Sequence, residues 1–188
     1  MDIIQLCATS FIIAFSGAAS PGTVTLTILK ESIDKGTKVG FLFSIGHALI
    51  EIPIVLILFF GLGPALLRPI LPLLGVIGGI FLIALGFLTI DTGLRFRPKA
   101  QESKPKEGGG SLELTALGAT LSVSNPYWIL WWLTIGATYI ISSIEFGLFG
   151  LISFYLSHIA ADFIVFIGLA MLVSRGQNMI GQKGYRMM

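Results

Sequence analysis

Five long apolar stretches constrain this chain more than any other feature of its sequence. As helices, each is long enough to cross a hydrocarbon core of about 30 Å, which takes about 20 residues. The stretches run over residues 3–29, 39–61, 70–90, 114–144 and 146–173. Lipid cannot satisfy open backbone polar groups, and no ten-residue alternating pattern indicates a barrel. The sequence therefore predicts an all-α polytopic membrane protein with five spans.

The composition agrees with a chain whose main solvent is lipid. Charged residues make up 12% of the 188 residues, against roughly 25% in an ordinary soluble domain. With a mean hydropathy of +0.89, this excludes an ordinary soluble domain, a disordered chain and a nucleic-acid-binding protein. The single cysteine, Cys7, excludes disulfide scaffolds and Cys-based metal or redox sites. No phosphate loop and no credible Ser/His/Asp set is present, so we predict neither an enzyme nor a cofactor.

The positions of the basic residues predict the orientation of the chain. On one side lie Lys30, Lys35, Lys38, Arg95, Arg97, Lys99, Lys104, Lys106, Arg175, Lys183 and Arg186, and on the other Arg68 alone. By the positive-inside bias, the N-terminus faces out and, with five spans, the C-terminus faces the cytoplasm of a cell (inner) membrane. The chain opens without an early Lys or Arg, which favours a retained first span over a cleaved signal peptide.

Four segments follow from these patterns. We predict a first transmembrane repeat over residues 1–92, a second, inverted repeat over 112–175 and a polar tail over 176–188. Between the repeats, residues 93–111 are charged, contain proline and end in a triple glycine, which predicts a flexible cytoplasmic linker. The second repeat has only two spans. We therefore expect a sixth span to be missing by truncation, the alternative being a native five-span protein.

The two repeats carry matching features. Ser20-Pro21-Gly22 and Ser124-Asn125-Pro126 interrupt the leading helix of each repeat. In the span that follows the interrupted helix of each repeat, a histidine precedes an acid by four residues. These pairs are His47 with Glu51 and His158 with Asp162. Because the first repeat has three spans, the second enters the membrane from the opposite side. Inverted repeats with interrupted helices in corresponding places are typical of secondary transporters.

These motifs resemble those of the lysine exporter (LysE/RhtB) family. Residues 20–23, Ser-Pro-Gly-Thr, are similar to its Pro-Gly-Pro element, with Thr23 in place of the second proline. The Gly46-x-x-x-Ile50-Glu51 segment resembles its Gly-x-x-x-Gly-Asp pattern, and Asn125-Pro126 its Asn-Pro element. The resemblance runs from residue 3 to about 173. It implies efflux of amino acids or related small solutes, coupled to protons.

Glu51 and Asp162 are the charged residues we expect to carry the chemistry. Each is the only charged residue of its predicted span, at a depth of about 18 Å and about 24 Å respectively. A charge there costs a few kcal/mol, and a carboxylate lowers that cost by binding a proton. We expect these acids to carry protons or bind a substrate ammonium group. The alternative is a neutral acid hydrogen-bonded to a neighbouring helix for packing.

His47 and His158 each share a helix face with the acid four residues on. If the two helices meet, two imidazoles and two carboxylates converge. We favour a role in orienting the acids or relaying protons, with no resident metal. The main alternative is divalent transition-metal efflux with His47, Glu51, His158 and Asp162 as ligands. An intramembrane metalloenzyme would use the same four side chains, and plain packing is the remaining alternative.

The helix breaks predict where a substrate carboxylate binds. Pro21 and Pro126 favour a new helix start, and the preceding Ser20 and Asn125 can cap its N–H groups. A helix N-terminus is partly positive and suits an anion. We therefore place Pro21, Gly22, Asn125 and Pro126 in the substrate site, with the substrate ammonium near the two acids.

Two further patterns have structural interpretations. Trp128, Trp131 and Trp132 follow the second break, and we expect aromatic packing or an interfacial belt rather than a cavity wall. Gly75 and Gly79, four residues apart, permit close helix approach. That approach is either internal packing or the seam of a homodimer.

Overall fold

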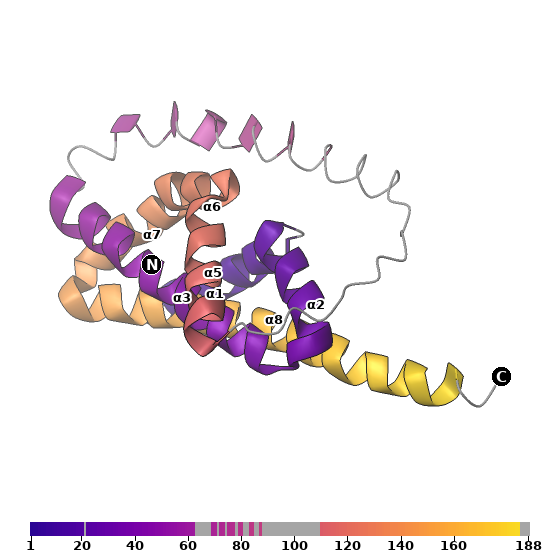
Figure 1. Ribbon diagram of the computed structural model, residues 1–188. Helices are drawn as coiled ribbons and strands as arrows, with labels where there is room; N and C mark the ends of the chain where they lie inside the picture. Colours follow the sequence, from indigo (N-terminus) through magenta and orange to yellow (C-terminus); the bar gives the residue numbers. More distant parts are fainter. Residues whose placement is uncertain are drawn as a thin grey trace.

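The computed structural model describes residues 1–20, 22–62 and 110–184, with scattered helical residues between 69 and 87. Among these residues every regular element is a helix and none is a strand (Figure 1). The predicted all-α class is therefore confirmed for this part of the chain. About half of the predicted third span and nearly all of the predicted linker lie outside the described residues, as does Pro21.

The first predicted span is interrupted near residues 20–22, as expected, and consists of two helices. Helix α1, Ile3–Ala18, starts in a capping box in which Asp2 and Gln5 exchange side-chain and backbone hydrogen bonds. Helix α2, Thr23–Lys35, follows at a bend of 68°. Its N-cap, Gly22, has no side chain to accept a hydrogen bond from the first turn. The bend thus leaves the start of α2 without a side-chain cap.

Helix α3, Lys38–Leu56, follows a tight turn and continues into the π-helix η1, Ile57–Leu62. The turn requires a glycine, because Gly36 has a φ of 72° and residues with a Cβ rarely adopt that conformation. The run Lys38–Gly61 is long and apolar enough to cross a membrane. It agrees with the predicted span over residues 39–61.

The fourth predicted span is also interrupted. Helix α5, Ser111–Val123, ends at Ser124, and α6, Pro126–Trp131, begins after Asn125. The Asn125 side chain accepts a hydrogen bond from the backbone N–H of Tyr127 at 3.0 Å, and Pro126 occupies the first turn, where a missing N–H costs nothing. The chain continues as the π-helix η2, Trp132–Gly136, and α7, Ala137–Ser143.

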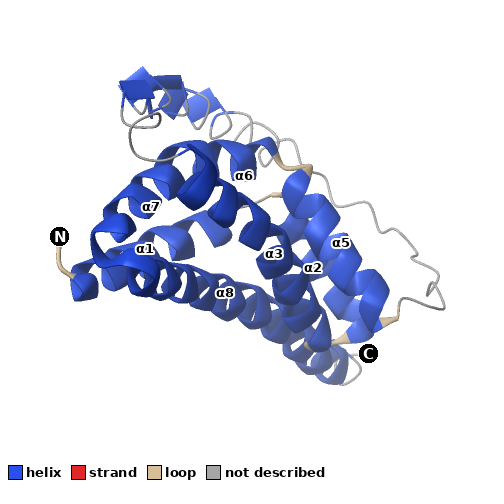
Figure 2. Cartoon of the chain, turned by 90° about the vertical axis from the view of Figure 1, so that its left-hand side faces the viewer, coloured by secondary structure: helices blue, strands red, loops and turns tan. Residues whose placement is uncertain are grey.

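Helix α8 is the longest of the described helices and runs along α1, α3 and α2 (Figure 2). It spans Gly147–Gly184 and follows the 3-10 turn η3, Ile144–Phe146. The turn into it uses Gly147 with a φ of 60°. The helix extends beyond residue 173, where we expected the fifth span to end, into the predicted polar tail.

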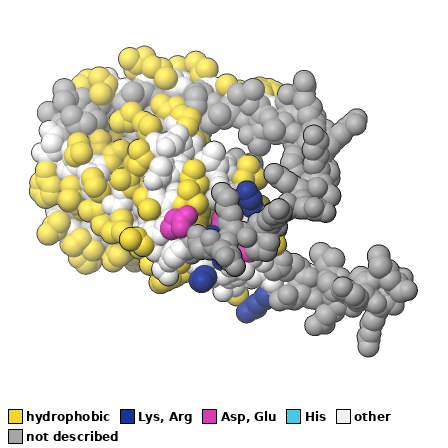
Figure 3. Space-filling view, in the orientation of Figure 1, with side chains coloured by type: hydrophobic (Ala, Val, Ile, Leu, Met, Phe, Trp, Pro, Cys, Tyr) yellow, Lys and Arg dark blue, Asp and Glu magenta, His cyan; other side chains and the backbone are white. Residues whose placement is uncertain are grey.

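Among the described residues, helix length and apolar composition identify fewer membrane spans than the five predicted for the whole chain. Two helical runs of the described residues are suited to cross a membrane, Lys38–Gly61 and Pro126–Gly176, and α1 with α2 is a third if the bent pair is one span. The second run includes α6, α7 and α8. Hydrophobic side chains cover much of the described surface in Figure 3, and Ile4, Phe60 and Leu172 are among the most exposed. Such a surface suits contact with lipid.

Close contact between α3 and α5 depends on two glycines. A Cβ on Gly46 would collide with the backbone of Thr115, and a Cβ on Gly118 with the backbone of Phe43. Small residues at these crossings let the helix backbones approach. The approach brings the middle of α3 against α5, and α3 also packs on α8.

Two apolar clusters occupy different levels of α3 and α8. One contains Val55 of α3 and Phe154 of α8, and the other contains Phe43 of α3 and Phe166 of α8. Along both helices, the polar residues singled out from the sequence lie between these levels. The fold therefore encloses a polar layer between two apolar ones.

Candidate functional site

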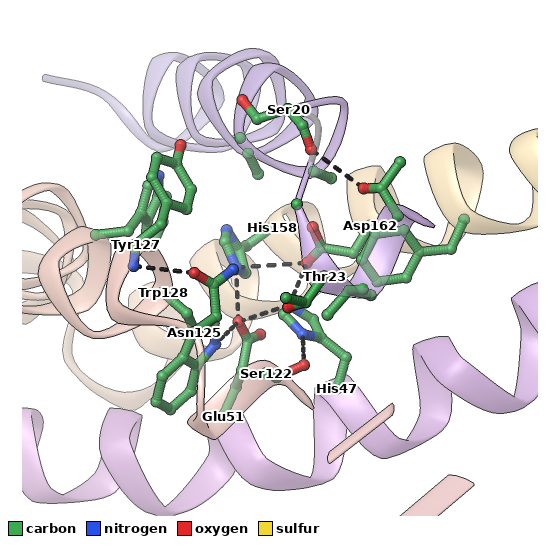
Figure 4. Close-up of a pocket in the computed structure, with 18 of the residues that line it drawn as sticks. Ser20, Thr23, His47, Glu51, Ser122, Asn125, Tyr127, Trp128, His158 and Asp162 are labelled. Carbon is green, nitrogen blue, oxygen red and sulfur yellow. Dashed lines mark hydrogen bonds and ion pairs between the residues drawn. The ribbon is translucent and has the colours of Figure 1, made fainter. Parts of the chain in front are cut away.

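Helices α3 and α8 each turn a histidine and an acid toward the same place (Figure 4). His47 and Glu51 come from α3, and His158 and Asp162 from α8. All four side chains are buried, with Glu51 1% and Asp162 3% exposed. We call these four residues the polar quartet. Residues more than a hundred positions apart thus form one buried cluster.

Each imidazole of the polar quartet faces both carboxylates. Within the helices, His47 Nε2 lies 3.1 Å from Glu51 Oε1, and His158 Nε2 lies 3.4 Å from Asp162 Oδ2. Between the helices, His158 Nε2 lies 3.3 Å from Glu51 Oε1, and His47 Nε2 lies 3.7 Å from Asp162 Oδ2. The two histidines therefore link the carboxylate of α3 to the carboxylate of α8.

Glu51 is held by two indole groups. The Nε1–H groups of Trp128 and Trp132 each donate to Glu51 Oε1 at 3.1 Å. Its other oxygen, Oε2, is buried and has no hydrogen-bond partner. A buried polar atom without a partner is costly. Oε2 is thus the atom of this carboxylate available to a proton or a bound cation.

The two histidines differ in what supports them. His47 Nδ1 lies 2.7 Å from Ser122 Oγ, and the Ser122 hydroxyl donates to the Gly118 carbonyl at 2.7 Å. His158 Nδ1 is buried without a partner. The His158 ring instead lies among aromatic rings, with the Trp131 centroid at 4.5 Å. The two rings therefore differ at Nδ1, where His47 has a hydrogen-bond partner and His158 has aromatic neighbours instead.

A cavity of about 660 Å³ opens beside the polar quartet. The four quartet side chains contribute to its wall, as do both interrupted helices. Polar lining comes from Ser20, Thr23, Thr25, Ser122 and Asn125, and aromatic lining from Tyr127, Trp128, Trp131 and Phe166. No Lys or Arg is among its lining residues in the described part of the chain. The cavity thus presents acids, histidines and neutral polar groups.

The first turn of α2 forms part of the cavity wall. Gly22, Thr23, Val24 and Thr25 line it, and the Gly22 N-cap supplies no side-chain acceptor for the N–H groups of that turn. These donors give the wall a partly positive edge. The N-terminal turn of α2 and the carboxylates of Glu51 and Asp162 therefore line the same cavity.

The structure places most of the predicted site residues together. The four members of the polar quartet converge, and Gly22, Asn125 and Pro126 line the same cavity. Pro21 lies outside the described residues. At the second break the side-chain cap of Asn125 has the predicted geometry. At the first break, no described hydrogen bond runs from an N–H group of the first turn of α2 to the Ser20 side chain.

Three partners of the quartet were not predicted. Trp128 and Trp132, assigned to packing or an interfacial belt, donate hydrogen bonds to Glu51, and Trp128 and Trp131 wall the cavity. The spacing of Trp128 and Trp132, four residues apart on one face, was the available signal. Ser122 gave no signal, because its role depends on α5 packing against α3.

Comparison with known proteins agrees with the resemblance seen in the motifs. The model of the LysE type translocator family matches residues 15–188, which is nearly the whole chain. No curated protein and no solved structure matches the chain. With its apolar helices and enclosed polar cavity, this chain belongs to the LysE type translocator family of integral membrane proteins that export small solutes.

Proposed function

We propose that this translocator exports amino acids or related small solutes across the inner membrane in exchange for protons. The observation that carries the proposal is the position of Glu51 and Asp162. One buried acid from each half of the chain borders a single cavity, and each has an oxygen without a hydrogen-bond partner. Such an oxygen binds either a proton or a cationic group of the substrate.

The cavity has complementary positions for a zwitterion. The ammonium group binds at Glu51 Oε2 and Asp162 Oδ2, which are buried and have no hydrogen-bond partner among the described residues. The carboxylate binds at the uncapped first turn of α2, where backbone N–H groups and the helix dipole favour an anion. Tyr127 and Trp131 offer apolar surface to the rest of the solute.

Exchange follows if protons and substrate compete for the same carboxylates. A protonated acid no longer attracts the substrate ammonium group, so protons arriving from outside promote release there. After the return to the cytoplasmic side, loss of those protons restores the negative charge that binds the next substrate. His47 and His158 orient the acids and pass protons between them.

We also propose that the chain is built from two inverted repeats, with the N-terminus outside and the C-terminus in the cytoplasm. Helix α3 of the first repeat would be equivalent to α8 of the second, since each carries a histidine and an acid four residues apart. The two helices also pack against each other. Residues 93–111 would link the halves in the cytoplasm. A homodimer through Gly75 and Gly79 completes this proposal, and both glycines have open space around them.

Uptake into inside-out vesicles tests the proposed exchange. We expect amino acids to accumulate when the vesicle lumen is acidic, and a protonophore to abolish the accumulation. Glu51→Gln and Asp162→Asn should abolish gradient-driven uptake while the protein stays in the membrane. Glu113→Gln is the matched control, because Glu113 is an exposed acid at the start of α5. Full activity in both site variants would contradict the proposal.

Divalent transition-metal efflux is the second candidate. It is favoured by one ligand atom each from His47, Glu51 and Asp162, all within 4.8 Å of one another. The same vesicles would then accumulate zinc, cobalt or manganese, and His47→Ala and His158→Ala would abolish that accumulation. Amino acids would have no effect on the metal flux. That result would replace amino-acid export as the function.

A further inference from the structure

We infer that His47, Glu51 and Asp162 form a binding site for a divalent transition-metal ion that, when occupied, ties α3 to α8 and stops solute transport. In this role the ion is an inhibitor and not the cargo. The binding site follows from geometry alone, whereas the block of transport rests on the proposed export function.

The spacing of the ligand atoms fits a small ion. In tetrahedral Zn²⁺ sites the metal lies about 2.0–2.1 Å from nitrogen and oxygen, which places the ligand atoms roughly 3.3 Å from one another. His47 Nε2 lies 3.7 Å from Asp162 Oδ2, and one ligand atom from each of His47, Glu51 and Asp162 lies within 4.8 Å of the others. Side-chain adjustments of up to about 1.5 Å would bring these atoms into a coordination shell.

His47 has the outer support of a metal ligand. Ligating histidines usually donate their second ring N–H to an oxygen, which fixes the tautomer and the ring orientation. Here the Ser122 hydroxyl donates to the Gly118 carbonyl, so its oxygen can accept the Nδ1–H of His47 at 2.7 Å. In that tautomer the lone pair of Nε2 is available to an ion bound between His47 and the carboxylates.

Each of the two carboxylates also has an oxygen atom that can bind the ion. Two indole N–H groups hold Glu51 Oε1, so Oε2 stays free. Asp162 Oδ2 is buried and also lacks a hydrogen bond. Two buried acids need positive charge. Among the described residues that line the cavity no Lys or Arg supplies it, which leaves protonated His47 and His158 or a bound cation. A divalent cation supplies it in one step.

The donor set selects the kind of metal. Imidazole nitrogen with carboxylate oxygen suits zinc, cobalt, nickel or copper, whereas magnesium and calcium prefer oxygen alone. His158 Nε2, 3.4 Å from Asp162 Oδ2, or a water completes the fourth position. The site is therefore specific for borderline transition metals.

Occupancy would join the two halves of the chain. His47 and Glu51 belong to α3 in the first half, and Asp162 belongs to α8 in the second. Exchange of access between the two sides of the membrane requires the halves to move against each other. An ion bound to both helices opposes that movement, so transport stops until the metal leaves.

Cobalt binding to the purified full chain in detergent tests the site without any transport. We expect saturable binding of one Co²⁺ per chain with a tetrahedral visible spectrum, displaced by Zn²⁺, which binds such sites more tightly. A Cys7→Ser background removes the only thiol. His47→Gln and Asp162→Asn should lower the affinity by more than about tenfold, and Ser122→Ala by about 10–100-fold. Size-exclusion profiles and melting temperatures show that each variant is folded.

Ser44→Ala is the matched control for Ser122→Ala. Ser44 is also buried and its hydroxyl also donates to the carbonyl four residues earlier, Gly40, but no bond to a histidine accompanies it. Its variant should bind Co²⁺ like the parent, and Ser122→Thr should recover the affinity. Co²⁺ binding that persists in both His47→Gln and Asp162→Asn is adventitious and overturns the site.

Solute counterflow in proteoliposomes tests the block. Micromolar Zn²⁺ should stop counterflow by the parent protein, and Ser122→Ala should need about 10–100-fold more Zn²⁺ for the same effect. If counterflow continues while Zn²⁺ is bound, the proposed inhibition is wrong. If the protein carries Zn²⁺ into the lumen, the ion is a cargo and the proposed inhibition is also wrong. If the metal-free chain moves no solute while the Co²⁺ site is intact, the proposed export has failed and the binding site stands.

Discussion

Trp132 and Glu51 are joined across the two halves of the chain by a hydrogen bond of 3.1 Å from the indole Nε1–H to Oε1. Trp132 is fully buried and Glu51 is 1% exposed. Trp128, one helical turn earlier, donates to the same oxygen. The acid of α3 is therefore fixed by the segment that follows the second helix break, which links the break to the charge in the cavity.

Glu51→Leu should destabilise the protein far more than Glu51→Gln. Glutamine keeps an oxygen that accepts the two indole N–H groups, whereas leucine leaves both without a partner. Each unpartnered N–H costs about 1–3 kcal/mol, so we expect a loss of roughly 2–6 kcal/mol in the free energy of unfolding. Thermal unfolding in detergent measures the difference. Equal melting temperatures for the two variants would show that the bonds to Glu51 do not stabilise the fold.

Gly46→Ala should disrupt the packing of α3 on α5. The added Cβ meets the Thr115 backbone, which cannot move aside as a flexible side chain would. We expect a destabilisation of about 1–3 kcal/mol, measured by thermal unfolding. Gly168→Ala on α8 is the matched control, since its Cβ meets nothing within 4 Å. A Gly46→Ala protein as stable as the control would contradict the close approach.

Asn125→Ala should weaken the second helix break. The variant loses the hydrogen bond from the Tyr127 N–H, and loss of an N-cap costs about 0.5–2 kcal/mol. Asn125→Ser restores a side-chain acceptor and should recover most of the stability. Melting temperatures of the three proteins test the cap. If serine is no better than alanine, the capping bond is not what stabilises this break.

The proposed orientation predicts opposite labelling of two engineered cysteines. In a Cys7→Ser background, Thr37→Cys lies in the turn between α2 and α3, and Glu145→Cys in the turn before α8; both positions are exposed. A membrane-impermeant maleimide applied to intact cells should label the Glu145→Cys variant. The Thr37→Cys variant should be labelled only after the cells are opened. The reverse pattern would invert the topology.

Several features could be predicted because they depend on local sequence. The membrane class follows from stretches of apolar residues, and the break at Asn125-Pro126 from the residue types that end and start helices. The four-residue spacing of His47 and Glu51, repeated in His158 and Asp162, predicted that each pair shares a helix face. The interruption predicted at residues 20–22 is likewise present, since α1 ends at Ala18 and α2 begins at Thr23.

The sequence by itself determined that buried acids would sit in apolar helices, each with a histidine one turn away, because helix periodicity alone fixes that relation. Only the tertiary structure decided which groups complete the cluster. The contacts of Ser122 with His47, and of Trp128 and Trp132 with Glu51, join residues at least 75 positions apart. They depend on how closely α5 approaches α3 and on where the chain restarts after Asn125. Such distances are set by backbone packing at Gly46 and Gly118, which no pattern within one helix encodes.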